Sequence, residues 1–243
     1  MIYEKRKKVS FYDLEANGEV KITAILKDIN EAAFFNAEDL GIGLEKTLET
    51  NLVFLISRIG ININRVPVLN EEITIRTWPG LATRSLFKRY GEILDVNQEK
   101  IMSWETIWVL IDTIERRIKK PSAFPVEIPQ LGPLEVTASA NKIIIPPNTT
   151  LVNEINHLVK FSELDLNMHM NNAKYGDLIL NVLSTTVFTN INLWEEIQFN
   201  YINEAKLNDL LTIRALKSED LIYIHGKMED KDVFSAIVRL KSN

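Results

Sequence analysis

Hydrophobic and polar residues alternate along much of the chain. In SRIGININRV, residues 57–66, the apolar Ile59, Ile61 and Ile63 are separated by small or polar residues, which predicts a strand with one buried face. The same period of two predicts strands at EITIRTW, SLFKRYGEIL and SWETIWVLID in the first part of the chain, and at EEIQFNYINE, LLTIRAL, LIYIHGKM and VFSAIVRL in the second.

A helical period precedes each group of strands. From Tyr175 to Leu183 apolar residues recur at i, i+3, i+4, i+7 and i+8, the pattern of a helix buried along one side. In the first part NEAAFFNAEDLG predicts a shorter helix that ends at Gly41. One helix followed by antiparallel strands, twice over, predicts an α+β protein: a tandem, or double, hotdog in which each sheet wraps around a central helix.

The two parts also resemble each other in sequence. LNEEITIR, residues 69–76, aligns without gaps with LNDLLTIR, residues 207–214, at an offset of 138. The same offset sets Ile59, Ile61 and Ile63 against Ile197, Phe199 and Tyr201. Two matches in one register indicate an internal duplication.

A proline-rich segment, about residues 119–150, separates the two parts. Proline disfavours both helices and central strands, so this segment predicts a connector. We therefore divide the chain into an N-terminal hotdog domain (1–135), a linker (136–150) and a C-terminal hotdog domain (151–243). The prolines of this segment are Pro121, Pro125, Pro129, Pro133, Pro146 and Pro147.

Composition narrows the classes of protein. The 243 residues carry a formal net charge of −5, whereas nucleic-acid-binding domains usually show a basic excess, so we expect no nucleic-acid partner. Cysteine is absent, which removes disulfides and thiol nucleophiles. No apolar run approaches the length of a membrane helix and no signal-peptide pattern follows the start. We expect a cytoplasmic protein without membrane insertion.

The most distinctive polar cluster is FSELDLNMHMNNAKY, residues 161–175. In an extended segment Asp165, Asn167 and His169 would share one face, and the cluster runs into the start of a helix, where backbone N–H groups are unpaired. Activated water and N–H donors aimed at a developing oxyanion are what thioester hydrolysis needs. We expect no metal and no cofactor, because the three histidines lack the spacing of metal ligands.

LDLNMHMNNAKY resembles the D-x-N-x-H-x-N-N-x-x-Y motif of the acyl-acyl carrier protein thioesterases of plants and bacteria, which consist of two hotdog domains. FNYINEAKLND is similar to the strand of that family that carries a catalytic glutamate, here Glu204. The first half agrees through SRIGININRVPVLNEEITIRTWP and TRSLFKRYGEIL, so the resemblance covers nearly the whole chain. Single-domain acyl-CoA thioesterases share only the H-x-N-N portion.

The resemblance implies that Asp165, Asn167, His169 and Glu204 form the catalytic set. Glu204 is suited to act as general base toward water, with Asp165 as a rival for that role. Asn167 would orient the water or the carbonyl, and His169 would hydrogen-bond or relay a proton to the departing thiol. Many plant members have a cysteine after the glutamate; Ala205 stands there, so attack by water is the expected route.

The repeat suggests one active site per chain. Subtracting 138 from the four positions gives Lys27, Ile29, Glu31 and Val66, so no identity is retained in the first half.

The predicted function is hydrolysis of fatty acyl-acyl carrier protein to free fatty acid, which ends chain extension. The alternatives are an acyl-CoA thioesterase and a non-catalytic hotdog protein that senses acyl thioesters. The partner implied is the acyl carrier protein, whose acidic surface would dock on a basic cluster, either Arg116–Lys120 or Arg84–Arg89. A homodimer is also possible, because hotdog pairs can associate further.

Overall fold

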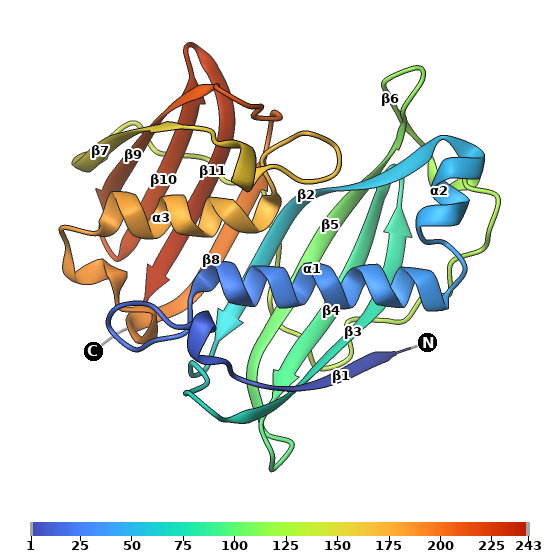
Figure 1. The fold of residues 1–243 in the computed structure, drawn as a ribbon, viewed down its shortest axis with the longest axis horizontal. Coiled ribbons are helices and arrows are strands. Elements are labelled where there is room, and N and C mark those ends of the chain that lie inside the picture. The colour runs from blue at the N-terminus through green and yellow to red at the C-terminus, as the bar shows by residue number, and fades with distance from the viewer. Residues whose placement is uncertain (1, 242–243) are drawn as a thin grey trace.

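The computed structural model describes residues 2–241, except for the side chain of Val187. One antiparallel sheet in the order β1-β3-β4-β5-β2-β8-β11-β10-β9-β7 runs through the molecule, with β6 paired to β5 (Figure 1). Its strands are β1 (Tyr3–Lys8), β2 (Leu52–Ile63), β3 (Glu72–Thr83), β4 (Leu86–Leu94), β5 (Lys100–Asp112), β6 (Arg117–Lys119), β7 (Thr150–Leu158), β8 (Trp194–Tyr201), β9 (Leu210–Ser218), β10 (Leu221–Met228) and β11 (Lys231–Leu240).

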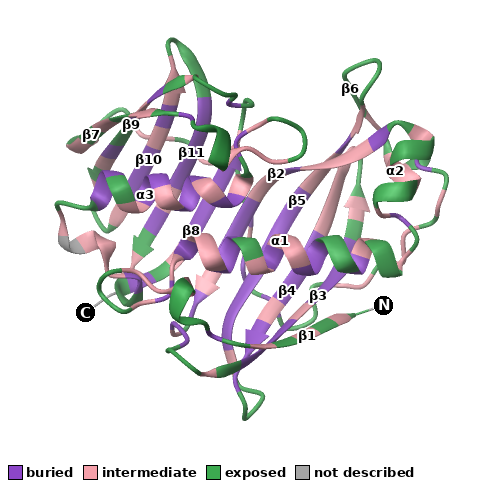
Figure 2. Ribbon diagram, in the orientation of Figure 1, coloured by how far each residue is buried: buried purple, intermediate pink, exposed green. Residues whose placement is uncertain are grey.

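Two principal helices lie on one face of this sheet, α1 over the first half and α3 over the second (Figure 1). Their apolar stripes face the strands, and most of the buried hydrophobic residues form a core that continues across both halves (Figure 2). The helices are α1 (Ile22–Asp39), α2 (Leu44–Thr50) and α3 (Tyr175–Leu183), with short 3₁₀ turns η1 (Phe11–Asp13), η2 (Pro121–Ala123), η3 (Phe161–Glu163), η4 (Asn172–Lys174), η5 (Val187–Thr189) and η6 (Ile191–Leu193).

Strands β2 and β8 join the two halves. Ile59 pairs with Phe199, and Ile61 with Ile197, around a central pair of Gly60 and Gln198. Gly60 and Gln198 are themselves related by the repeat offset of 138, so the halves are arranged around a pseudo-twofold axis at this pair. The predicted tandem hotdog is confirmed, and its two sheets are continuous.

Upstream of the strands the repeat register differs from the predicted one. The turn η1 with the bridge Leu14–Val20 repeats as η3 with the bridge Leu164–Met170, at an offset of 150. The difference arises because the first half has a longer helix, 18 residues in α1 against nine in α3, and the additional helix α2. The prediction of a shorter first helix was therefore wrong.

The connector is ordered against the sheet and contains little regular structure. Residues 132–143, which we call the strap, cross the sheet face opposite the helices, where side chains of the strands bind strap backbone. Ala140 N–H donates to Glu105 Oε2 at 2.8 Å, Asn141 N–H to Gln198 Oε1 at 3.1 Å and Ile143 N–H to Asn200 Oδ1 at 2.9 Å. The strap thus spans the seam between the halves. The domain limits at residues 135 and 150 stay a prediction.

Candidate active site

The segment that carries Asp165, Asn167 and His169 is a tight turn. Met168 N–H donates to the Asp165 carbonyl at 3.0 Å, and Asp165 N–H donates to the His169 carbonyl at 2.8 Å. Met168 has a positive φ of 62°, a conformation that reverses the chain. The segment is therefore a chain reversal, and Asp165, Asn167 and His169 do not share a face in the way that an extended segment would give.

The Asp165 carboxylate stabilises this turn. Its Oδ1 accepts the N–H of Asn167 at 2.8 Å and the N–H of His169 at 3.3 Å, the pattern of an aspartate that caps a turn. The Asn167 side chain is exposed beside it. These two hydrogen bonds give Asp165 a structural role in the turn.

Glu204 lies in the loop that follows β8, and the tip of the β10–β11 hairpin holds that loop. The N–H groups of Ile202 and Asn203 both donate to the Val233 carbonyl, at 2.9 and 3.1 Å. The Asn203 side-chain amide donates to the Asp232 carbonyl at 2.7 Å. These bonds fix the backbone directly before Glu204.

Backbone pairing brings the turn and the loop together. Met170 N–H donates to the Ala205 carbonyl at 2.8 Å, and His169 and Lys206 form a bridge. As a result His169 Nε2 lies 3.0 Å from Glu204 Oε2. The His169 side chain is 26 % exposed and that of Glu204 is 53 % exposed, so water reaches the glutamate.

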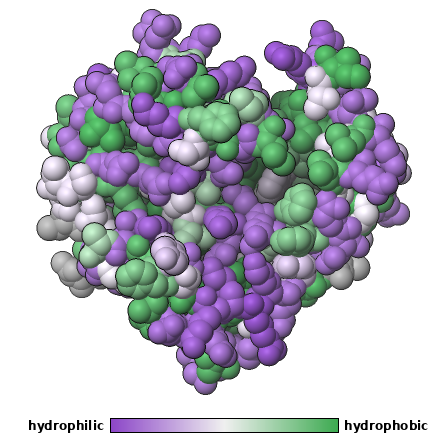
Figure 3. Space-filling view, viewed as in Figure 1, coloured by the Kyte–Doolittle hydropathy of each residue, from purple (hydrophilic) through white to green (hydrophobic). Residues whose placement is uncertain are grey.

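All four predicted residues line one cavity of about 450 Å³. It lies where β2 and β8 diverge beyond their shared pairs, and it therefore has walls from both halves of the chain. Figure 3 shows this region as a notch in the outline, with hydrophobic atoms on either side. The first half contributes Leu55, Ile56, Ser57, Val109 and Ile118, and the second contributes Asp165, Asn167, His169, Met170, Asn172, Tyr175, Tyr201, Ile202, Asn203 and Glu204.

The helix start offers fewer free donors than expected. Asn171 caps it: its side chain accepts the Ala173 N–H at 2.9 Å, and its carbonyl accepts the Lys174 N–H at 2.8 Å. These two hydrogen bonds give Asn171 a structural role. Hydrogen-bond donors for an oxyanion must therefore come mainly from side chains. The Asn167 amide is such a donor in the turn, and it lines the cavity.

Two tyrosines that were not among the predicted catalytic residues, Tyr175 and Tyr201, also line the cavity. Burial raises the pKa of Tyr175, and the carboxylates of Asp165, Asp209 and Glu204 raise it further, so its hydroxyl stays protonated. Burial also raises the pKa of Tyr201, whose hydroxyl donates to the Asn172 carbonyl at 3.2 Å. The final tyrosine of the D-x-N-x-H-x-N-N-x-x-Y pattern was the signal for Tyr175.

The first half contains a counterpart of this turn with a different task. At the offset of 150, Asp165, Asn167 and His169 correspond to Glu15, Asn17 and Glu19, so the asparagine is retained and the predicted counterparts Lys27, Ile29 and Glu31 were wrong. Glu19 accepts the Ile191 N–H at 2.9 Å and the Asn192 amide at 2.5 Å. This second turn therefore fastens the first half to the loop before β8.

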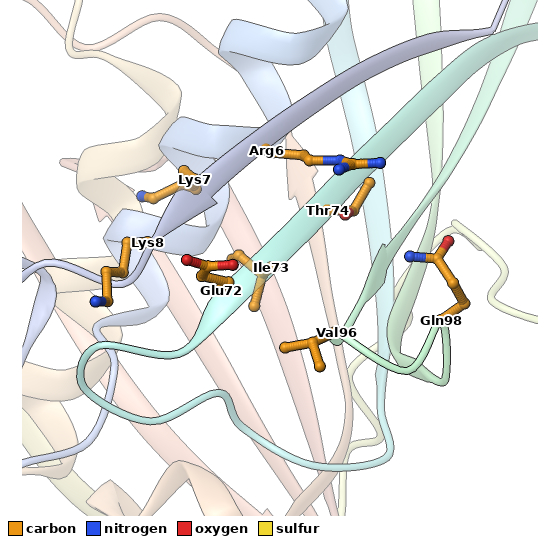
Figure 4. A pocket seen from close by; sticks show the side chains of 8 residues that line it. All are labelled: Arg6, Lys7, Lys8, Glu72, Ile73, Thr74, Val96 and Gln98. Atoms are coloured by element: carbon orange, nitrogen blue, oxygen red, sulfur yellow. The ribbon is translucent and has the colours of Figure 1, made fainter.

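A larger hollow of about 510 Å³ lies on the edge strand β1 and its neighbour β3 (Figure 4). Arg6, Lys7, Lys8, Glu72, Thr74 and Gln98 make its lining mostly polar. The strands β3, β4, β5 and β2 separate β1 from β8, so this hollow contains none of the predicted site residues. We do not assign it to the reaction.

Within residues 2–241 no group of three or more His, Cys, Asp and Glu side chains is arranged to hold a metal ion. None of the helices in the same range combines the length and the apolar composition that crossing a bilayer requires. The cytoplasmic location stays a prediction.

This chain is similar to curated plant proteins over most of its length. It is 22 % identical over 226 residues to the chloroplastic dodecanoyl-acyl-carrier-protein hydrolase of Cinnamomum camphora. The aligned region covers 87 % of this chain and 58 % of that protein. A palmitoyl-acyl carrier protein thioesterase of Gossypium hirsutum is 22 % identical over 197 residues and is covered to 46 %. The chain thus spans roughly half the length of these curated relatives.

Solved structures of similar fold cover the whole chain. An acyl-ACP thioesterase from Bacteroides thetaiotaomicron superposes with a TM-score of 0.80 at 20 % identity, over 99 % of this chain and 98 % of that one. The 12:0-ACP thioesterase from Umbellularia californica superposes with a TM-score of 0.81 at 16 % identity, over 100 % and 98 %. At these identities the superpositions establish the double hotdog fold.

Family models match both halves of the chain. The acyl-ACP thioesterase N-terminal domain matches residues 1–123, and the acyl-ACP thioesterase C-terminal domain matches residues 148–236. With the predicted motif in the second half, this chain belongs to the acyl-ACP thioesterase family.

Proposed function

We propose that this protein hydrolyses the thioester of fatty acyl-acyl carrier protein and releases free fatty acid. The observation that carries the proposal is the pair of His169 and Glu204, 3.0 Å apart, at a cavity with apolar walls. Two segments distant in sequence are bonded to each other so that the two side chains meet there. The family membership names the substrate class.

In the proposed mechanism Glu204 accepts a proton from a water molecule, whose oxygen attacks the thioester carbon. The carbonyl oxygen gains negative charge, and the Asn167 amide donates to it. The intermediate then expels the thiolate of the carrier's prosthetic arm, which takes a proton from the His169–Glu204 pair. Fatty acid and thiol are the products, and neither a covalent intermediate nor a cofactor is required.

Geometry favours Glu204 over Asp165 as the base. Asp165 Oδ1 already accepts two backbone N–H groups, so this oxygen is engaged in holding the turn. Glu204 has a half-exposed carboxylate whose contact is the His169 ring. We therefore propose that Asp165 stabilises the turn and that Glu204 is the general base that activates the water.

The proposal is tested with purified protein and matched thioesters. One fatty acyl group is presented on acyl carrier protein and on CoA, and initial rates are compared at equal concentrations. We expect kcat/KM to be higher with the carrier protein. Equal rates would indicate the acyl-CoA thioesterase, and binding of both thioesters without turnover would indicate the non-catalytic sensor.

The β6 hairpin is the proposed docking site for the acidic carrier. Arg116, Arg117 and Lys120 are exposed and form no ion pair with any residue in 2–241, and their neighbour Ile118 lines the catalytic cavity. The other basic cluster is less suitable, because Arg89 is buried and Lys88 pairs with Glu105 at 2.6 Å.

Replacing Arg116, Arg117 and Lys120 together by glutamate is expected to raise KM for the carrier-linked thioester roughly tenfold, because like charges then face each other on encounter. KM for a short thioester without a carrier should stay unchanged. The matched control changes three exposed cations elsewhere, Arg6, Lys8 and Lys27, to glutamate. An equal rise in KM in the control, or for both substrates, would contradict docking on β6.

A further inference from the structure

A row of apolar side chains crosses the sheet beside the catalytic cavity. On the face that carries the helices, Trp108 of β5 lies directly between Ile56 of β2 and Phe87 of β4. Ile56 lines the catalytic cavity, whereas Trp108 and Phe87 line a second cavity of about 50 Å³. Since neighbouring strands are about 4.8 Å apart, the two cavities are separated by little more than one side chain, the Trp108 indole.

This row is incompletely covered. Trp108, Phe87 and the adjacent Phe54 are only partly buried, although each lies on an inward-facing position of the sheet. Phe54 and Phe87 contact each other edge to face, with ring centroids 5.0 Å apart. Aromatic side chains of this size normally bury most of their surface, so the row offers an apolar floor that is continuous with the catalytic cavity.

The indole is fixed in place. Trp108 Nε1 donates to Thr106 Oγ1 at 2.8 Å, two positions along the same strand. The next row begins with Ile59 on β2 but is polar on β5 and β4, where Thr106 neighbours Arg89, whose guanidinium donates to Asn36 Oδ1 at 2.6 Å. An alkyl chain that enters from Ile56 is therefore confined to the apolar row and meets the edge of Trp108.

We infer that the acyl chain of the substrate lies across β2 and β5 on this floor, and that the Trp108 indole determines the longest chain the enzyme accepts. The inference rests on the proposed hydrolysis and adds a specificity-determining residue to it. The cavity behind the indole, bounded by Phe87 and Ile128, takes the end of a longer chain once the indole is removed.

The test is a panel of saturated acyl-carrier thioesters of increasing even chain length, hydrolysed by the wild type and by Trp108→Leu. Each buried methylene favours binding by a factor of about four, so two more carbons correspond to roughly tenfold. We expect Trp108→Leu to raise kcat/KM roughly tenfold for the chain two carbons longer than the wild-type optimum, relative to the optimum itself. Phe87→Ala alone should not shift the optimum, because Trp108 still stands before it, but it should extend the shift of Trp108→Leu.

Trp78→Leu is the matched control. Trp78 is a fully buried tryptophan of the opposite sheet face, where it donates to the Gly132 carbonyl. Its replacement should lower stability without changing the preferred chain length.

If the wild type turns over thioesters and Trp108→Leu keeps the wild-type preference, or if Trp78→Leu shifts it equally, the inference is overturned. A wild type that turns over no acyl thioester would refute the proposed function itself. If Trp108→Leu does not fold, Trp108→Phe removes less side-chain volume and should shift the preferred chain length in the same direction by a smaller amount.

Discussion

Glu204→Gln is expected to lower kcat for acyl-carrier thioesters by about 10²- to 10⁴-fold, the usual contribution of a general base. At 1.36 kcal/mol per tenfold, this is about 3–5 kcal/mol of transition-state stabilisation. The amide retains the size of the carboxylate and a hydrogen bond to His169, which lies 3.0 Å away, but it does not accept a proton from water. Steady-state kinetics with a single chain length measures the effect, and KM should change little.

Asp165→Asn provides the matched comparison. Asparagine retains the Oδ1 acceptor that binds the N–H groups of Asn167 and His169, so the turn should persist. We expect a loss of roughly tenfold or less, and circular dichroism should show unchanged folding. If Asp165→Asn loses far more activity than Glu204→Gln, then Asp165 is the base and the assignment made above is wrong.

Gly60→Ala is expected to destabilise the fold by about 3 kcal/mol, the upper part of the range for overpacked positions. A Cβ at Gly60 would lie 2.1 Å from the Ser139 carbonyl oxygen and 2.7 Å from its carbon, and both belong to backbone that has no freedom to rotate away. The strap would have to move away from the seam, which would also weaken the hydrogen bonds that Asn141 of the strap forms with the side chains of Gln198 and Asn200. Urea unfolding of both proteins measures the difference.

Gly132→Ala serves as the control within the strap. No atom lies within 4 Å of a Cβ placed there, so its effect should stay within about 0.5 kcal/mol. A Gly60→Ala variant as stable as Gly132→Ala would show that the strap does not press on the seam as described.

Much of the fold was predictable because it depends on local periodicity. Each segment quoted from the sequence contains a strand of the structure, since alternation in a half-buried strand is imposed by the sheet itself. The segment predicted to carry Glu204 on a strand is the exception at its end, because β8 stops at Tyr201 and Glu204 lies in the loop. The pairing of Ile59 with Phe199 extends the same register across the seam, and the repeat had already aligned these strands. The early start of α1 was also visible in principle, because Ile22, Ile25 and Ile29 continue its apolar stripe.

The geometry of the site was less accessible. Bonds within residues 165–169 close the turn, and the alternation of letters in LDLNMH fits an extended run as well as a reversal at Met168. The meeting of His169 with Glu204 depends on the bond from Met170 to Ala205, between segments that periodicity treats separately. The resemblance to a family connected them, whereas composition and spacing alone did not.

The Glu19 contact with the loop before β8 has an evolutionary consequence. In a symmetric pair of identical subunits every substitution is present in both copies, so a catalytic residue that is lost from one subunit is lost from the other as well. Fusion of the copies into one gene product removes that constraint. In this chain the turn of the first half holds the loop before β8 through Glu19, whereas the turn of the second half carries His169 beside Glu204.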